Sequence, residues 1–375
     1  MNKIKVVNII SDTNIGGAGK CVITHAKFHN REKFDLTVVV PRGSKLKSEI
    51  DALDVRCIEV DGVADKSLSI KGIMAQKRLF RQLGCDVVHA HATLSARIAA
   101  RLAGVRAVVY TRHSVFEPSR FMKSPIGRLL NKIIAALFSD RIIAVAEAAA
   151  KNITDMGVSR KKISVVLNGI SPLKPLTKEE KEEQRKRFGV AEDEKVVSLV
   201  ARLETVKGHD DYIKAAQILK EQGVKVKLIA AGSGSREAEL KENEDVLFTG
   251  FISDAYNLIG ITDISANASF GTEATSISLL EGMSLGLPAV VTDYGGNPGV
   301  IKDGENGFLV PTHSGEKLAE KIKLLVEDEH LYEKMSKRAT EIFYEKFTAE
   351  KATKQIEEIY LSVGGQSNGK KKNKI

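Results

Sequence analysis

The residues best suited to chemistry gather in the second half of the chain, around two junctions between a strand and a helix. Arg202 follows a predicted strand, and Lys207 comes five residues later. Glu273 and Glu281 flank the segment Thr275–Ser278, which lies at the start of a predicted helix and offers hydroxyls and unsatisfied backbone N–H groups. This set supplies cations and donors for phosphate oxygens, and carboxylates that accept from hydroxyls. A diphosphate flanked by two sugars needs that combination.

Two glycine-containing turns that follow predicted strands are further candidates. Gly16 and Gly17 precede a helix, where backbone N–H groups and the helix dipole favour an anion. A nucleoside-triphosphate P-loop is excluded, because its first glycine would be Asn14 and its lysine is followed by Cys21 instead of Ser or Thr. Gly232 in the second turn lacks the rest of a dinucleotide fingerprint. We expect it to form a tight turn and, secondarily, a wall of a ligand site.

Short β-branched runs alternate with helical stretches in both halves, which predicts an α/β protein with two doubly wound domains. The runs are short and mostly apolar, as a parallel sheet covered on both faces requires. The predicted strands are Ile4–Ile10, Leu36–Val40, Val55–Val60, Asp86–His91, Ala107–His113, Arg141–Ala146, Ile163–Leu167, Val196–Val200, Val226–Ala231, Val246–Gly250, Ile264–Ala268 and Pro288–Thr292. Two such domains place a ligand in the cleft between them, at the carboxyl ends of both sheets.

The domain boundary is predicted near residue 170, where the alternation pauses. Pro172, Pro175 and a charged helix with a Thr177–Glu180 capping box follow, so residues 1–170 and 171–348 are assigned to separate domains. The final residues, 366–375, contain four lysines and are predicted to be a disordered basic tail.

The composition excludes several classes of protein. The 375 residues are 43% hydrophobic and 28% charged, which is not the composition of a disordered chain. No apolar run approaches the roughly 20 residues that cross a bilayer, and the first apolar stretch ends too early for a signal peptide. The three cysteines lack metal-ligand spacing, so we expect reduced thiols in a cytoplasmic protein.

The net charge of +9 is divided unevenly along the chain. Residues 1–170 contain 28 Lys and Arg against 14 Asp and Glu, whereas residues 171–375 contain 29 against 34. The first half therefore carries +14 and the second −5, which indicates an anionic partner for the first half.

Taken together, the motifs resemble those of the family 4 retaining glycosyltransferases over residues 5 to about 345. The segment 270–291 is similar to the family's E-x7-E signature through Glu273 and Glu281, and Arg202 with Lys207 resembles its diphosphate-binding pair. The glycine turn at Gly16 and the segments 86–91, 168–170 and 295–297 also fit. The resemblance implies a GT-B fold, in which two Rossmann-like domains face a central cleft. It also implies that a final helix, here 349–363, crosses back to the first domain.

The resemblance implies a role for each matching residue. Arg202 and Lys207 would neutralise the nucleoside diphosphate leaving group, Glu281 would bind the ribose hydroxyls, and Glu273 would bind the donor sugar. Thr275, Ser276, Ile277 and Ser278 are the implied phosphate contacts. Phe251 is the implied contact of the base, and His113 that of the donor sugar or phosphate. Where the family has Gly-Phe-Gly after the first glutamate, this chain has Ala274-Thr275-Ser276, so only the backbone phosphate contacts carry over there.

No metal or other cofactor is predicted. The sequence has no Asp-x-Asp pair to chelate a divalent cation, so we expect protein cations and a helix terminus to stabilise the leaving group. The resemblance implies retention of configuration, by front-face attack in which the departing phosphate takes the acceptor proton. The resemblance also implies that the donor is a sugar nucleotide, for which we expect a UDP-sugar rather than a GDP-sugar, and that the acceptor is a glycan or a lipid-linked molecule.

The excess basic charge of the first half includes a stretch that also carries apolar side chains. Arg120, Lys123, Arg128 and Lys132 alternate there with Phe121, Met122, Leu129 and Leu130. Such a stretch suits an anionic membrane surface, on the inner face of the cell membrane, and it equally suits a solvated helix with its apolar side in the core.

Two other functions remain open from the sequence. A nucleotide-sugar epimerase has the same architecture and binds the same donors without an acceptor. A basic nucleic-acid-binding protein is disfavoured, since the chain has no Trp, only 5% aromatic residues and no recognised nucleic-acid-binding motif.

Overall fold

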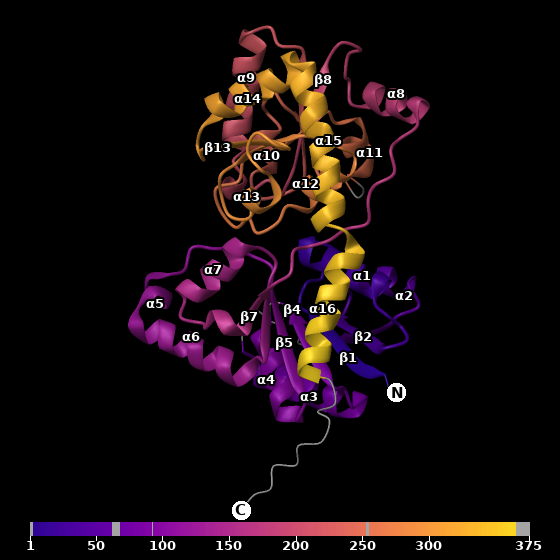
Figure 1. Ribbon diagram of the computed structural model, residues 1–375, viewed down its shortest axis with the longest axis vertical. Coiled ribbons are helices and arrows are strands. Elements are labelled where there is room, and N and C mark those ends of the chain that lie inside the picture. Colours follow the sequence, from indigo (N-terminus) through magenta and orange to yellow (C-terminus); the bar gives the residue numbers. More distant parts are fainter. Residues whose placement is uncertain (1–2, 62–67, 92, 253–254, 365–375) are drawn as a thin grey trace, which may run out of the picture.

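The computed structural model describes residues 3–61, 68–91, 93–252 and 255–364, and the predicted basic tail lies outside these residues. Two parallel β-sheets, each covered by helices, form two domains that lie one above the other (Figure 1). The predicted α/β fold with two doubly wound domains is therefore correct.

The first domain is built on a seven-stranded sheet in the order β3-β2-β1-β4-β5-β6-β7. Alternate side chains of β1 enter different cores: Val6 and Ile10 pack on one face of the sheet, and Val7 and Ile9 on the other. Both faces are thus buried, as the apolar runs predicted. The strands are β1 (Ile4–Ile10), β2 (Phe34–Pro41), β3 (Arg56–Val60), β4 (Val87–His91), β5 (Ala107–Arg112), β6 (Arg141–Ala144) and β7 (Ile163–Val165).

Helices cover the two faces of this sheet. One core takes side chains from α1, α2 and α16, and the other takes them from α3 and α4. The helices of the domain are α1 (Gly17–Phe28), α2 (Leu46–Asp51), α3 (Ile70–Leu83), α4 (Leu94–Ala103), α5 (Arg120–Lys123), α6 (Pro125–Phe138) and α7 (Glu147–Asp155).

The second domain contains a six-stranded sheet in the order β10-β9-β8-β11-β12-β13. The strands are β8 (Lys195–Val200), β9 (Val226–Ala231), β10 (Leu247–Phe248), β11 (Ile264–Asn267), β12 (Ala289–Thr292) and β13 (Gly307–Val310). Sequence reasoning missed β13, since its four residues start with a glycine that is typical of a turn. A Cβ on Gly307 would lie 2.2 Å from the carbonyl oxygen of Ala289, so glycine permits the close pairing of β12 and β13.

The helices of the second domain surround this sheet and include the helix that lies at the cleft, α12. They are α8 (Lys178–Arg187), α9 (His209–Glu221), α10 (Glu237–Leu240), α11 (Tyr256–Ile261), α12 (Ile277–Ser284), α13 (Asn297–Val300), α14 (Gly315–Glu327) and α15 (Glu329–Lys346). The predicted capping box of α8 is present, with Thr177 and Glu180 each accepting from the other's backbone N–H.

The chain crosses between the domains at two places that lie side by side. The Ile170 N–H donates to the Phe347 carbonyl (2.9 Å), and the Ala349 N–H donates to the Ile170 carbonyl (3.0 Å). A Cβ on Gly169 would lie 2.2 Å from the Thr348 carbonyl oxygen, so a side chain there would separate the two crossings. The two connections thus form one junction.

After the second crossing, α16 (Ala349–Gly364) lies along the first domain, in line with α15 above it (Figure 1). Ile359 and Tyr360 of α16 are buried in the core beneath the first sheet. The Arg106 guanidinium donates to the Gly364 carbonyl at 3.0 Å and holds the end of the helix. The last helix in sequence is therefore a structural part of the first domain.

Candidate functional site

A cavity of ≈ 280 Å³ opens between the two domains. The first domain lines it with the loop Ile15–Gly17, which follows β1, and with Lys20 of α1. From the second domain the lining residues are Val200, Ala201, Arg202, Lys207, Ala255, Glu273, Thr275, Ser276, Ile277, Ser278 and Glu281. The structure thus brings together the predicted cations, carboxylates and helix start, and it places the predicted glycines Gly16 and Gly17 opposite them.

The N-terminus of α12 faces this cavity. Its N-cap Ser276 makes no side-chain hydrogen bond to the helix backbone, and no acidic residue lies in the first turn. The hydroxyl protons of two predicted phosphate contacts are already used within the protein. The Thr275 hydroxyl donates to the Val145 carbonyl (3.1 Å), and the Ser278 hydroxyl donates to the Val200 carbonyl (3.2 Å). In this arrangement the helix end offers an anion its backbone N–H groups rather than these two hydroxyl protons.

Lys207 and Glu273 form a buried ion pair, with Lys207 Nζ 2.8 Å from Glu273 Oε2. Their side chains are only 10% and 8% exposed. Lys207 precedes Gly208, whose φ of +70° and close approach to the Ala268 carbonyl oxygen admit only glycine (a Cβ would lie 2.0 Å from that oxygen). The backbone therefore fixes Lys207 in place, and part of its charge is already compensated by the carboxylate.

Glu273 uses only one of its oxygens for protein contacts. Asn267 Nδ2 and Ser269 Oγ approach the same Oε2 as Lys207, at 3.3 and 3.2 Å. Among the residues that the structure describes, none donates to Glu273 Oε1. The carboxylate is thus rigidly oriented and retains one oxygen that can accept from a ligand hydroxyl.

Arg202 is the cation that the protein leaves open. It lies in the loop after β8, its side chain is exposed, and within the described ranges it has no ion-pair partner. Glu281, by contrast, is paired across the cavity: Lys20 Nζ of the first domain lies 2.6 Å from Glu281 Oε1. Sequence reasoning assigned Glu281 to the ribose and gave Lys20 no role.

Three predicted donor contacts do not line this cavity. Gly232 serves close packing, since a Cβ there would lie 1.9 Å from the Ala201 carbonyl oxygen. Phe251 is 69% exposed and lies outside the lining residues. His113 follows β5, which ends at Arg112 rather than at the histidine, and its ring turns toward His91 in the interior of the first domain. The predicted contacts of these three residues with the donor therefore stay predictions.

His113 belongs to a buried network of four histidines between the first sheet and α16. His91 Nδ1 lies 2.8 Å from His113 Nε2, and the rings of His89 and His91 are 4.2 Å apart. His89 Nδ1 lies 2.6 Å from the Tyr360 hydroxyl, which donates to Asn8 Oδ1 at 3.2 Å. The fourth member, His25, lies 2.8 Å from Asn8 through its Nδ1. These rings surround a second cavity of ≈ 30 Å³.

Burial keeps these four imidazoles neutral. It lowers the pKa of His25 to about 3 and that of His113 to about 4. The pKa values of His89 and His91 also lie well below the usual range, mainly through burial and partly through repulsion between the rings. Since the described residues contain no group of three or more His, Cys, Asp or Glu placed to hold a metal ion, the cluster is a network of neutral hydrogen-bonding rings.

The match with known protein families agrees with this geometry. Residues 15–172 match the family model described as Glycosyltransferase Family 4, and residues 180–342 match Glycosyl transferases group 1. The chain is 29% identical to the putative glycosyltransferase EpsD of Bacillus subtilis over 297 residues, which cover 73% of this chain and 76% of that protein. It is 24% identical to an Escherichia coli UDP-Gal:alpha-D-GlcNAc-diphosphoundecaprenol alpha-1,3-galactosyltransferase, over 96% of this chain and 98% of that protein.

Solved structures show the same fold. The Anabaena protein Alr3699/HepE, crystallised with UDP-glucose, superposes with a TM-score of 0.83 and 24% identity, over 96% of this chain and all (100%) of that one. A glycosyltransferase from Rickettsia africae superposes with a TM-score of 0.82 and 22% identity, over 98% of this chain and 100% of that one.

Two parallel-sheet domains that face one cleft define the GT-B class of glycosyltransferase fold. Within that class, the chain belongs to family 4 of the glycosyltransferases. The relatives include a Staphylococcus aureus protein named for capsular polysaccharide biosynthesis, CapM, which is 24% identical over 92% of this chain and 94% of its own length. These matches give no support to the epimerase alternative.

Proposed function

We propose that this glycosyltransferase moves a sugar from a nucleoside-diphosphate sugar, a UDP-sugar in particular, to a glycan or lipid-linked acceptor. The proposal rests on the groups that line the cavity. These are the Arg202 guanidinium, which has no ion-pair partner among the described residues, the N-terminus of α12, and the Glu273 carboxylate, whose Oε1 accepts no hydrogen bond from a described residue. Support for the donor comes from Alr3699/HepE, which was crystallised with UDP-glucose. Support for the acceptor comes from the name of the E. coli relative, which contains a diphosphoundecaprenol.

In the proposed complex the diphosphate lies against the backbone N–H groups of Ile277 and Ser278 and is neutralised by Arg202. Lys207 adds positive potential from beside Glu273. Glu273 Oε1 accepts from a hydroxyl of the donor sugar, and Glu281 accepts from the ribose. Because these groups are already oriented, they stabilise the charge that develops on the departing diphosphate with little rearrangement.

The transfer is proposed to retain the anomeric configuration and to need no metal. The only carboxylate that we place at the donor sugar, Glu273, is held by three donors, so we assign it to binding. The departing phosphate would then take the acceptor proton as the new bond forms on the same face. Product analysis by NMR in the presence of a chelator tests both points: inversion, or loss of activity with the chelator, would contradict them.

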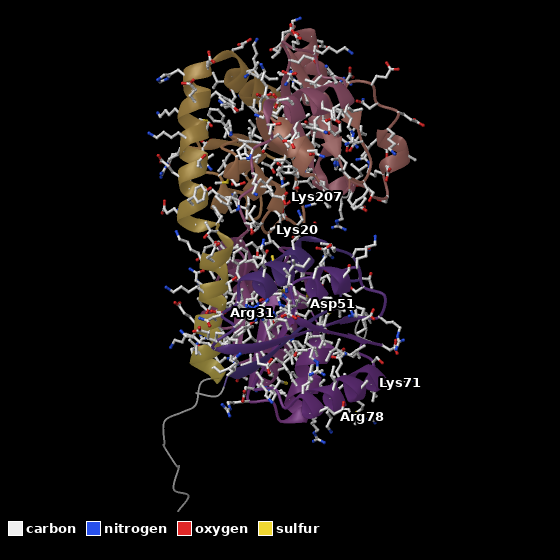
Figure 2. The ribbon with its side chains drawn as sticks, turned by 90° about the vertical axis from the view of Figure 1, so that its right-hand side faces the viewer. Lys20, Arg31, Asp51, Lys71, Arg78 and Lys207 are labelled. Atoms are coloured by element: carbon white, nitrogen blue, oxygen red, sulfur yellow. The ribbon has the colours of Figure 1, made fainter. Side chains whose placement is uncertain are left out.

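Binding of UDP and of uridine to Arg202→Ala and Glu281→Ala tests the donor site. We expect Arg202→Ala to weaken UDP about tenfold or more, because a charge-assisted contact is worth about 1.5–3 kcal/mol, and to spare uridine. Glu281→Ala should weaken both ligands. Arg78→Ala is the matched control, since Arg78 is exposed at the far end of the first domain (Figure 2). UDP binding that survives both cleft substitutions would mean that the site is misassigned.

We also propose that α5 and α6 hold the enzyme on an anionic membrane surface. Of the fourteen residues of α6, only Gly127 and Ala135 are buried. Six large apolar side chains of the two helices are exposed, beside the basic residues predicted from the sequence: Phe121, Ile126, Leu129, Leu130, Ile133 and Leu137. The α6 members recur at helical spacing, so they form an apolar face, and the neighbouring cations complement acidic headgroups.

Both helices lie on an outer side of the first domain, away from α16 (Figure 1). No helix among the described residues is long and apolar enough to cross a bilayer, so the proposed attachment is at the surface. Flotation with vesicles of increasing acidic-lipid content tests it. Binding should rise with acidic lipid and be lost in Ile126→Glu/Leu130→Glu, but not in Met74→Glu, which alters an exposed apolar residue of α3. Binding that ignores lipid charge would overturn the proposal.

A further inference from the structure

The ion pair between Lys20 and Glu281 joins the two walls of the cavity. Lys20 lies in the first half of α1, and Figure 2 shows it at the cleft, on the side of the first domain that faces Lys207. Its side chain is 44% exposed, whereas that of Glu281 is 14% exposed. The lysine is therefore the partner that can leave, because its flexible stem already reaches solvent.

Among the described residues, two of the three cations that line the cavity are paired with carboxylates. Lys207 is held by Glu273 and Lys20 by Glu281, which leaves Arg202 as the cation with no partner among the described residues. The N-terminus of α1 adds positive potential beside Lys20. Its N-cap residue is Gly16, which has no side chain to cap the helix, and its first turn contains no acidic residue. A nucleoside diphosphate brings several negative charges into this space together with ribose hydroxyls.

We propose that Lys20 is a diphosphate-binding residue supplied by the first domain, and that it leaves Glu281 when the donor binds. The ribose hydroxyls replace the ammonium group as donors to the Glu281 carboxylate. The released ammonium group then pairs with a phosphate oxygen of the same ligand. This exchange rests on the proposed function, since it requires a nucleoside diphosphate in the cavity.

The exchange makes different demands on the two parts of the ligand. A nucleoside without phosphates must displace Lys20 from Glu281 and offers it nothing in return. A nucleoside diphosphate displaces Lys20 and supplies a new partner. Removal of the lysine should therefore weaken binding of the diphosphate without weakening binding of the nucleoside, and a simple link between the domains would not produce that pattern.

Isothermal titration of UDP and uridine into the Lys20→Ala protein tests the inference. We expect UDP to bind about tenfold more weakly, and uridine to bind as well as before or more tightly, because Glu281 is then unoccupied. Lys20→Arg should keep most of the UDP affinity. Lys27→Ala is the matched control, since Lys27 lies on the same helix and packs over Phe28 away from the cavity lining.

Two results would overturn the inference. If UDP and uridine weaken equally, Lys20 only braces the domains, and if neither changes, the ion pair has no part in binding. Arg202→Ala in the same titration separates this failure from a failure of the proposed function. A UDP affinity that is insensitive to Arg202 rejects the donor site as a whole, whereas sensitivity to Arg202 but not to Lys20 rejects only the exchange. Thermal melts of each variant verify that it is folded.

Discussion

The buried histidine network of the first domain and the charged cavity between the domains are both clusters of polar side chains, yet they differ in how their groups are satisfied. In the network, neutral rings bond to one another, to the Tyr360 hydroxyl and to Asn8 and Thr111, and among the described residues His25 Nε2 and His91 Nε2 are buried without a partner. In the cavity, charged groups are paired incompletely, and Arg202 and Glu273 Oε1 keep unused capacity. The network is suited to hold α16 in place, and the cavity is suited to accept a ligand.

This comparison separates two kinds of buried polarity that a sequence presents alike. A buried group that has spent its hydrogen bonds within the protein adds rigidity, while a preoriented group with a free donor or acceptor is available for recognition. His113 bonds to His91 within the network through its Nε2, and its predicted contact with the donor stays a prediction.

Acidification should have the largest effect, and it should fall mainly on the network. Because burial lowers the pKa of the four histidines, the folded protein binds fewer protons than the unfolded chain below about pH 6.5. Their contribution to stability is complete above that pH and is lost as the pH falls toward the folded values. Each of the four histidines lowers the free energy of unfolding by about 1.4 kcal/mol for every pH unit below about 6.5. We therefore expect the free energy of unfolding to fall by about 5 kcal/mol at pH 5.5.

Hydrogen exchange followed from pH 7.5 to 5 measures this loss region by region. Amides of β1, β4 and α16 should lose protection before those of β11 and β12, which belong to the second domain. If the two domains lose protection in parallel, the histidines are not the cause.

Removal of one member of the buried ion pair should have the next largest effect. Glu273→Ala leaves the Lys207 ammonium group buried without its carboxylate, which typically costs about 3–5 kcal/mol. Denaturant unfolding measures the change in free energy. The double variant Lys207→Met/Glu273→Leu should recover most of the stability but none of the sugar transfer. If the double variant recovered sugar transfer, the Lys207–Glu273 pair would serve only to stabilise the fold, as the histidine network does.

Tyr360→Phe should have the smallest effect of the three. The change removes the hydroxyl that joins His89 to Asn8 and leaves polar groups without a partner, at a cost of about 1–3 kcal/mol. Transfer by the folded protein should stay close to that of the wild type, since no residue involved lines the donor cavity. A large fall in kcat with unchanged stability would show that the network takes part in sugar transfer and does not only stabilise the fold.

The sequence predicted those features that depend on local pattern. The alternation of apolar runs and helices predicted both sheets, and residues near strand ends, such as Arg202 and Glu273, do lie at the cavity. Contacts between distant segments carried no such signal. Lys20 and Glu281 are 261 residues apart, and His89 and Tyr360 are 271 apart, so neither pairing is visible in the spacing of residues.

A signal for Lys20 was nevertheless present. It lies one turn after Gly16 and Gly17, at the position of a P-loop lysine, although Cys21 follows where a P-loop has Ser or Thr. The more general observation, a lysine one turn inside a helix whose glycine start faces a predicted anion site, pointed to the residue that the structure places in the cavity.

The position of α16 also bears on how the chain folds as it leaves the ribosome. Ile359 and Tyr360 complete the core of the first domain, although they are synthesised after the entire second domain. All strands of the first sheet are made by residue 165 and those of the second by residue 310, but the core of the first domain lacks α16 until the last helix is made. The core of the N-terminal half therefore stays incomplete for longest, and a nonsense mutation at residue 349 would remove α16 from the first domain while leaving every strand and helix of the second domain in place.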